Sequence, residues 1–313
     1  MASPTTLELA AGGWWDGAAR RLLRNRAALL GMAIVGLIAL LALFAPWVDH
    51  HSPTDQHLES TLEGPSGQFW LGTDQLGRDQ YSRLVHGARV SLTIGVLTQG
   101  VAVVLGVAVG LTAGLGGRRT DALLMRLTDV AYSFPDLLLL VLLVSIFGAS
   151  MSMLVLAIGL VSWTTIARLV RGQVLSLQEE EFVLAARATG ASEVRIALRH
   201  LLPNVAGPVI VTAAFGVPAA IFAEAALAFI GLGMPPPAPS WGRLVTDSFG
   251  AMFVAPHLAI TSCLAIALTM LSFTFIGDAL RDALDPRSQG GRGVPDVAPA
   301  PAPPLAAEER RAA

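Results

Sequence analysis

The chain has 313 residues, of which 53% are hydrophobic and only 14% are charged, with a net charge of −2 and a mean hydropathy of +0.61. A soluble domain carries nearer a quarter of charged residues, and several apolar runs here exceed the roughly 18 residues that indicate a membrane-spanning helix. The composition therefore predicts an all-α, polytopic membrane protein, and the slightly negative charge argues against a nucleic-acid partner.

All 21 basic residues are arginine, so the chain contains no lysine. A phosphate-binding P-loop needs its lysine, and Schiff-base chemistry needs a lysine amine. The sequence also has no HExxH or GxSxG motif and no His/Cys cluster at ligand spacing within an apolar run. We therefore expect no catalytic residue, cofactor or metal site, and any ATP that drives this protein would be hydrolysed by another chain.

Six membrane spans are predicted from the apolar runs and the charged residues that flank them. Residues 137–167 contain no charged residue, a stretch too long for one ordinary span and too short for two with a turn. A third span is therefore expected to run from about Leu123 to Phe147. It would carry Asp129 and Asp136 into the membrane. The other spans are expected at residues 27–48, 90–115, 152–170, 204–232 and 256–277.

The arginines are distributed unequally between the two sides of these predicted spans. If the N-terminus is cytoplasmic, the outer segments hold only Arg78, Arg83, Arg89 and Arg243, which leaves 17 of the 21 arginines on the inner side. Cytoplasmic segments carry an excess of basic residues, so both termini are predicted to be cytoplasmic. The resulting parts are a cytoplasmic segment (1–26), the first span (27–48), an outer loop (49–88), a five-helix core (89–285) and a Pro/Ala/Gly-rich, disordered cytoplasmic tail (286–313).

The third predicted span carries four polar residues at helical spacing. Asp129, Tyr132, Ser133 and Asp136 follow an i, i+3, i+4, i+7 pattern, which would place them on one helical face over about 10 Å. Pro135 is expected to bend the helix next to the last of them. Such a face would either border a translocation path or form a polar interface with another span or subunit.

Two further polar features are predicted on the outer side. Glu224 lies near the outer end of the fifth span, where we expect it to snorkel toward water or cap backbone amides, and it stays a candidate for the translocation path, with substrate contact as the alternative. The outer loop contains metal-binding residue types, but their spacing fits no ordered site, which favours a solvated, irregular loop. These residues are Asp49, His50, His51, Asp55 and His57. Residues 72–79, GTDQLGRD, have the composition of a tight turn and are expected to form a docking surface.

A charged, amphipathic segment, residues 179–204, lies between two long apolar runs. Residues 179–189 are good helix formers, and Gly190 is expected to end this helix. Ser192 can cap a second short helix, which Pro203 would end before the fifth span. A helix–glycine–helix unit of this kind could dock in a groove of a soluble partner or lie on lipid headgroups, and the residues alone leave both open.

The same segment resembles the EAA loop of ATP-binding-cassette (ABC) importer permeases, whose pattern is Glu-Ala-Ala, three residues, Gly, nine residues, then Ile-x-Leu-Pro. Ala185, Ala186, Gly190, Leu202 and Pro203 match in register, whereas Leu184 and His200 occupy the Glu and Ile positions. The resemblance implies that the two helices act as a lever in a cleft of an ATPase subunit. The residues expected to couple the chain to that ATPase are Glu181, Ala185, Ala186, Arg187, Gly190, Arg195, Leu202 and Pro203.

Three further motifs extend the resemblance over about residues 25–287. They are LGTDQLGRDQYSRLVHGARVSLTIG (71–95), EAALAFIGLGMPPPAPSWG (224–242) and GDALRDALDPR (277–287), and they resemble the second, C-type permease subunit of the dipeptide/oligopeptide/nickel importer family. The resemblance implies the type I ABC permease fold in a bacterial inner membrane, with a periplasmic outer loop. It also implies a sister permease, two ATPase subunits that bind ATP and Mg²⁺, and an extracytoplasmic solute-binding protein.

The expected cargo is a di- or oligopeptide, with nickel or another small solute as the alternative within the same family. From a different class, a stand-alone ion-coupled transporter could use Asp129 and Asp136 as carrier sites. The discriminating property is autonomy, because such a carrier would transport without partners or ATP.

Overall fold

The computed structural model describes residues 17 and 19–284, which form a helical bundle and contain no β-strand within these ranges. Five of the described helices are long and apolar enough to cross a membrane, and a bent pair adds a sixth if it counts as one span. The all-α membrane fold is therefore confirmed. The predicted tail, 286–313, and most of the predicted segment 1–26 lie outside the described residues.

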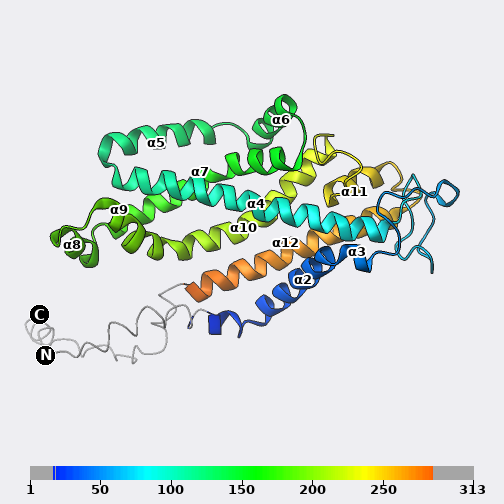
Figure 1. Ribbon diagram of the computed structural model, residues 1–313, viewed down its shortest axis with the longest axis horizontal. Coiled ribbons are helices and arrows are strands. Elements are labelled where there is room, and N and C mark those ends of the chain that lie inside the picture. The colour runs from blue at the N-terminus through cyan, green and yellow to red at the C-terminus, as the bar shows by residue number, and fades with distance from the viewer. Residues whose placement is uncertain (1–16, 18, 285–313) are drawn as a thin grey trace, which may run out of the picture.

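The elements follow one another in the order shown in Figure 1. They are α2 (Arg26–Leu43), α3 (Ala45–Val48), the 3₁₀ turn η1 (Leu58–Ser60), α4 (Gln80–Leu115), α5 (Gly117–Tyr132), α6 (Asp136–Phe147), α7 (Met151–Leu177), α8 (Glu181–Ala188), α9 (Glu193–Arg195), the π-helix η2 (Ile196–Leu201), α10 (Leu202–Phe229), α11 (Trp241–Phe249) and α12 (Pro256–Leu284). We call the end of the bundle that carries residues 49–79 the loop end. The opposite end, which carries α8, is the α8 end.

The helices α4 and α7 form the centre of the bundle and pack along each other's length (Figure 1). Gly106 and Gly110 on α4 allow this, since a Cβ atom would lie 2.6 Å from the Cβ atoms of Ile166 and Val170 on α7. Gly114 continues the row at the same four-residue spacing. Small residues at this spacing let two membrane helices approach closely, where dispersion contacts replace the hydrophobic effect as the source of stability.

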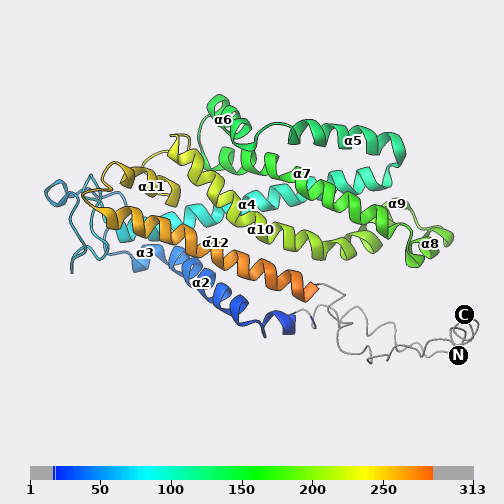
Figure 2. The ribbon, with the colours of Figure 1, turned by 180° about the vertical axis from the view of Figure 1, so that it is seen from behind.

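A second layer consists of α2 and α12, which run side by side in both views (Figure 1, Figure 2). Gly31 on α2 faces the backbone of α12, where an added Cβ atom would lie 2.6 Å from the carbonyl oxygen of Ser272. The helix α10 contacts both α12 and α4 and so joins this layer to the central pair. The start of α2 and the end of α12 both lie toward the α8 end of the bundle (Figure 2).

The predicted spans differ from the helices at several ends: α7 and α12 each continue about two turns beyond the predicted residues, to Leu177 and Leu284, and the first two spans differ for identifiable reasons. The first span was expected to reach Val48, but α2 ends at Leu43 and a separate turn, α3, follows with Pro46 at its start. A proline ring lacks the N–H and clashes with the carbonyl four residues back, which stops the longer helix. The second span was expected from residue 90, but α4 begins at Gln80, where the Asp79 carboxylate caps the free backbone N–H groups.

The third predicted span is not one helix. Its residues form α5 and α6, whose axes meet at 85° across a break of three residues. The bend falls at Pro135, as expected, because proline cannot donate a backbone hydrogen bond and disfavours the helical conformation of the residue before it. The prediction of one continuous polar face is therefore wrong: Asp129 and Tyr132 lie in the last turn of α5, and Asp136 lies in the first turn of α6.

The outer loop is irregular and mostly exposed, as predicted, but its aromatic side chains pack together at its centre. Phe69 is buried at its centre, and the rings of His51 and His57 lie 5.0 and 5.6 Å from the Phe69 ring. His50 stacks on Trp70 at 4.1 Å. Within the described ranges, no group of three or more His, Cys, Asp or Glu side chains has the geometry of a metal site.

Candidate functional site

The unit formed by α8, α9 and η2 projects from the α8 end of the bundle (Figure 1). Gly190 ends α8 with φ +82°, its N–H donates to the carbonyl of Arg187, and the N–H of Ala191 donates to the carbonyl of Ala186. This pair of bonds is a Schellman motif, which requires a left-handed residue at the position of the glycine. Ser192 then caps the next helix by accepting a bond from the N–H of Arg195. The predicted helix–glycine–helix order is confirmed.

Pro203 does not end the second helix, contrary to the prediction. Residues Glu193–Phe229 form one continuous helical segment of 37 residues. A π-helical turn precedes the proline and accommodates a residue that cannot donate a backbone hydrogen bond. In that turn the N–H of Leu202 donates to the carbonyl of Ala197, five residues back. The projecting unit is therefore continuous with the membrane-spanning helix α10.

Buried apolar side chains anchor the projecting unit to the bundle. Val183, Ile196 and Leu201 are fully buried against Val170 and Val174 of α7. The unit is also braced by Arg187, whose guanidinium donates to the side-chain oxygen of Gln178 at 3.2 Å and pairs with Glu193 at 3.3 Å. Arg187 thus acts inside the unit instead of facing a partner.

A groove of 430 Å³ opens on the outer surface of this unit. Small and apolar residues line it together with two arginines that form no ion pair with another described residue. The lining residues are Phe182, Ala185, Ala186, Thr189, Ala191, Arg195, Arg199 and His200. Two leucines next to them in the sequence, Leu184 and Leu198, are more than half exposed. Exposed apolar side chains beside cationic ones are typical of surfaces that bind a partner.

Of the eight predicted coupling residues, Ala185, Ala186 and Arg195 line this groove. Glu181, Leu202 and Pro203 lie outside it. The sequence pattern missed Arg199 and His200, which the π-helical turn brings beside α8, with the His200 ring 6.5 Å from that of Phe182. Their spacing from α8 in the sequence carries no signal of this contact.

Two of the predicted path residues, Asp129 and Tyr132, contact a side chain that the sequence did not single out. Arg168 of α7 pairs with the Asp129 carboxylate at 2.9 Å and lies 4.2 Å above the Tyr132 ring. The Ser133 hydroxyl donates to the carbonyl of Asp129 and closes α5. Asp136 is exposed beyond the break and does not join this group. The break therefore has a polar cluster on one side, at the end of α5, and an exposed carboxylate on the other, at the start of α6.

Glu224 neither snorkels nor caps backbone amides, and that prediction is wrong. Its side chain is fully buried, and its Oε1 accepts a hydrogen bond from the Ser240 hydroxyl at 2.7 Å. The Ser240 oxygen in turn caps α11 by accepting from the N–H of Arg243. Trp241 completes the link to α4, because its indole N–H donates to the carbonyl of Leu84. Glu224 thus fastens α11 onto α10.

Glu224→Gln is expected to leave thermal stability and transport close to the parent, because the amide oxygen still accepts the Ser240 bond. Glu224→Ala is expected to lose about 2–4 kcal/mol, the sum of a buried hydrogen bond and a cavity. Thermal unfolding of the purified complex measures both. Loss of transport in Glu224→Gln at unchanged stability would show that the charge, rather than the bond, is needed.

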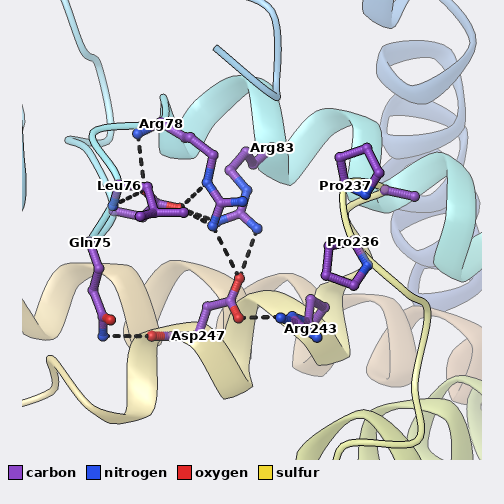
Figure 3. Close-up of a pocket in the computed structure, with 10 residues that line it drawn as sticks. Gln75, Leu76, Arg78, Arg83, Pro236, Pro237, Arg243 and Asp247 are labelled. Carbon is purple, nitrogen blue, oxygen red and sulfur yellow. Dashed lines mark hydrogen bonds and ion pairs between the residues drawn. The ribbon is translucent and has the colours of Figure 1, made fainter. Parts of the chain in front are cut away.

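At the loop end, residues 72–79 form the predicted tight turn, in which the Asp74 carboxylate accepts from the N–H groups of Leu76 and Arg78 at 2.9 Å each. Asp74 also pairs with Arg83, whose side chain is only 2% exposed, and Arg83 reaches Asp247 of α11 at 2.9 Å. These ion pairs join segments more than 160 residues apart. They border a cavity of 270 Å³ (Figure 3).

A helical bundle with these apolar spans and a projecting helix–glycine–helix unit defines a multi-pass transport permease. The model of the family described as "Binding-protein-dependent transport system inner membrane component" matches residues 106–290, and that of the "N-terminal TM domain of oligopeptide transport permease C" matches residues 13–65. The first match covers more than half of the chain. The chain belongs to this family of binding-protein-dependent inner membrane components, as a permease of the C type found in dipeptide and oligopeptide ABC systems.

Individual relatives agree with this membership. The chain is 41% identical over 273 residues to the dipeptide transport system permease protein DppC of Alkalihalophilus pseudofirmus, which spans 87% of this chain and 90% of that protein. It is 40% identical over 285 residues to the oligopeptide transport system permease protein OppC of Escherichia coli K12, and this alignment covers 90% of this chain and 94% of that protein. Among solved structures, the fold is similar to one from the inward-facing MetNI methionine ABC transporter, with a TM-score of 0.53 at 18% identity over 65% of this chain and 96% of that one.

Proposed function

We propose that this permease forms half of the translocation pathway of an importer for di- or oligopeptides and is driven by separate ATPase subunits through residues 181–203. The groove at the α8 end is the observation that carries this proposal. Its small and apolar residues, exposed leucines and unpaired arginines suit a protein partner, and its continuity with α10 lets force on the unit reach a membrane-spanning helix. The absence of lysine supports the assignment of ATP hydrolysis, with its Mg²⁺, to partner chains.

The proposed orientation places the α8 end in the cytoplasm of a bacterium and the loop end in the periplasm. The arginine distribution supports it, with 17 of 21 arginines in the segments assigned to the inner side. The structure is compatible, because the start of α2 and the end of α12 lie toward the same end as α8 (Figure 2).

The peptide cargo is proposed from the relatives, two of which are named for dipeptide and oligopeptide transport. The remaining partners follow from the family: a sister permease, two ATPases and an extracytoplasmic solute-binding protein. Nickel or another small solute is the competing cargo. Uptake of a labelled tripeptide into proteoliposomes, competed with unlabelled peptide or with Ni²⁺, separates the two.

Site-directed cross-linking tests the coupling surface. Leu198→Cys in a Cys263→Ser background places one thiol beside the groove, and Leu58→Cys places a thiol of similar exposure at the loop end. In the assembled complex, a photoreactive probe on Leu198→Cys is expected to capture an ATPase subunit, whereas the probe on Leu58→Cys captures none. ATPase capture at Leu58 would contradict the proposed orientation, and ATP-independent uptake by the isolated chain in liposomes would instead support a stand-alone carrier.

The polar cluster at the α5–α6 break is proposed to border the pathway. Irregular backbone at membrane depth is tolerated where it is covered by protein or lines a water-filled cavity. Asp129 is 65% exposed and Arg168 38% exposed, so their ion pair contributes at most about 1 kcal/mol to stability. Neutralisation of Asp129 and Asp136 is therefore expected to leave the bundle folded, so that a change in uptake reports on function.

Asp129→Asn combined with Asp136→Asn is accordingly expected to lower peptide uptake about tenfold, the effect of losing a contact of roughly 1.4 kcal/mol. Assembly with the sister permease, measured by co-purification, should stay at the parent level. Unchanged uptake would remove the pathway assignment, and loss of co-purification would assign the cluster to the subunit interface.

A further inference from the structure

The cavity at the loop end is bordered by ionic side chains from two distant parts of the chain (Figure 3). Arg78 and Arg83 come from the turn before α4 and from its first turns, and Arg243 comes from α11. We propose that this cavity is a carboxylate receptor, which binds an acidic side chain of the extracytoplasmic solute-binding protein when that protein docks. The inference rests on the proposed function and adds the chemistry of one docking contact.

The charges around the cavity do not balance. Three arginines face two aspartates, Asp74 and Asp247, which leaves one positive charge in excess. The two carboxylates have little acceptor capacity left: Asp74 accepts from two backbone N–H groups and two arginines, and Asp247 accepts one bond from each of the three arginines. A carboxylate offers about four acceptor positions, so only about one, on Asp247, remains for the other N–H groups of the three arginines, and a further acceptor would be accommodated.

Donors without acceptors remain on the arginines. The Nε of Arg83 is buried and has no hydrogen-bond partner. Arg243 donates to Asp247 through Nε at 2.8 Å, which leaves its two terminal nitrogens for a second acceptor. Its side chain is 32% exposed, so an incoming group can reach it. A carboxylate that enters the cavity can accept from the terminal nitrogens of Arg243, in a charge-assisted hydrogen bond that is stronger than one between neutral groups.

The size and walls of the cavity favour a side chain over a free peptide. Its 270 Å³ fall below the roughly 300–1,000 Å³ typical of small-molecule sites. Pro236 and Pro237 form one wall (Figure 3) and present rigid apolar surface to the methylene groups of an Asp or Glu side chain. The ion pairs hold the turn and α11 together before binding, which limits the entropy lost on docking.

The location also fits a docking contact. The cavity lies at the end of the bundle opposite to the groove of the α8 unit (Figure 1), and therefore on the periplasmic side in the proposed orientation. Gln75 adds a tether between the turn and α11, since its side-chain amide donates to the carbonyl of Asp247. A carboxylate bound here would contact the turn and α11 together.

The test is a titration of the purified solute-binding protein against the assembled complex in nanodiscs, at several salt concentrations. Arg243→Gln is expected to raise the Kd by roughly 10- to 100-fold and to flatten its salt dependence. The Kd of Arg243→Lys, which keeps the charge but not the guanidinium fork, should lie between that of the parent and that of Arg243→Gln. Arg89→Gln is the matched control, because Arg89 is an exposed arginine on α4 outside the cavity, and it should bind like the parent.

Folding and cargo are controlled separately. Thermal unfolding of Arg243→Gln checks that the α11 contacts survive. Arg243→Glu, combined with a lysine in place of the acidic residue of the solute-binding protein, should restore binding. A Kd and salt dependence in Arg243→Gln equal to those of the parent would overturn the proposal. Parent-like docking with lost discrimination between free-acid and C-terminally amidated peptides would overturn it in favour of a cargo carboxylate. In both outcomes ATPase coupling through residues 181–203 would persist, so the proposed function would stand.

Discussion

Gly190→Val is expected to lower ATP-driven uptake about tenfold while the protein still reaches the membrane. The glycine has φ +82°, and an added Cβ atom would meet no atom within 4 Å. The penalty is therefore conformational: a β-branched residue in the left-handed region costs roughly 1–2 kcal/mol. A loss of this size, about tenfold in an equilibrium, shifts the turn between α8 and α9 away from the Schellman geometry. Uptake and ATPase activity of the reconstituted complex measure the effect.

Gly190→Asn is the matched control, because asparagine tolerates the left-handed conformation and also adds a side chain. It should retain most of the uptake. If Gly190→Val supported parent uptake with parent ATPase stimulation, the turn would not need its geometry and the lever would not transmit force. An equal loss in both variants would instead indicate that any side chain at this position blocks the partner.

Arg83→Met is expected to destabilise the complex by about 3–5 kcal/mol, the largest effect predicted for a single substitution. Arg83 is 2% exposed and pairs with Asp74 and with Asp247. Removal of the arginine takes away the buried guanidinium that bridges the two carboxylates, although Arg78 still contacts both, and the loss of one partner of a buried ion pair is strongly unfavourable. The outer turn and α11 should separate first, because this ion pair joins them. A fall in the midpoint of thermal unfolding in detergent measures it.

Two further variants isolate the cause. Arg89→Met removes an exposed arginine from the same helix and should change the midpoint little. Arg83→Lys keeps the positive charge but not the guanidinium fork that bridges the two aspartates, and it should lose less stability than Arg83→Met. A parent-like midpoint of thermal unfolding in Arg83→Met would mean that the ion pairs of Arg83 are solvated and contribute little to stability.

Local features of the chain were predictable because they depend on neighbouring residues alone. The apolar runs locate α2, α4, α7, α10 and α12, since the hydrocarbon core requires a minimum length of apolar helix. Gly190 and Ser192 mark the turn between α8 and α9, because each meets a backbone requirement within five residues. Pro135 likewise marks the bend between α5 and α6. The family membership rests on motifs of the same local kind.

Contacts between distant segments were not predictable from these patterns. Glu224 was expected at the membrane surface, yet Ser240 and α11 bury it. The polar residues of the third predicted span lie on two helices, α5 and α6, whose axes meet at 85°. Asp129 forms an ion pair with Arg168 of another helix, α7. Apolar periodicity specifies that a helix forms, but the pairing of its charges depends on which helices pack together and at what angle. That packing follows from small residues such as Gly106 and Gly110, which set how closely α4 and α7 approach.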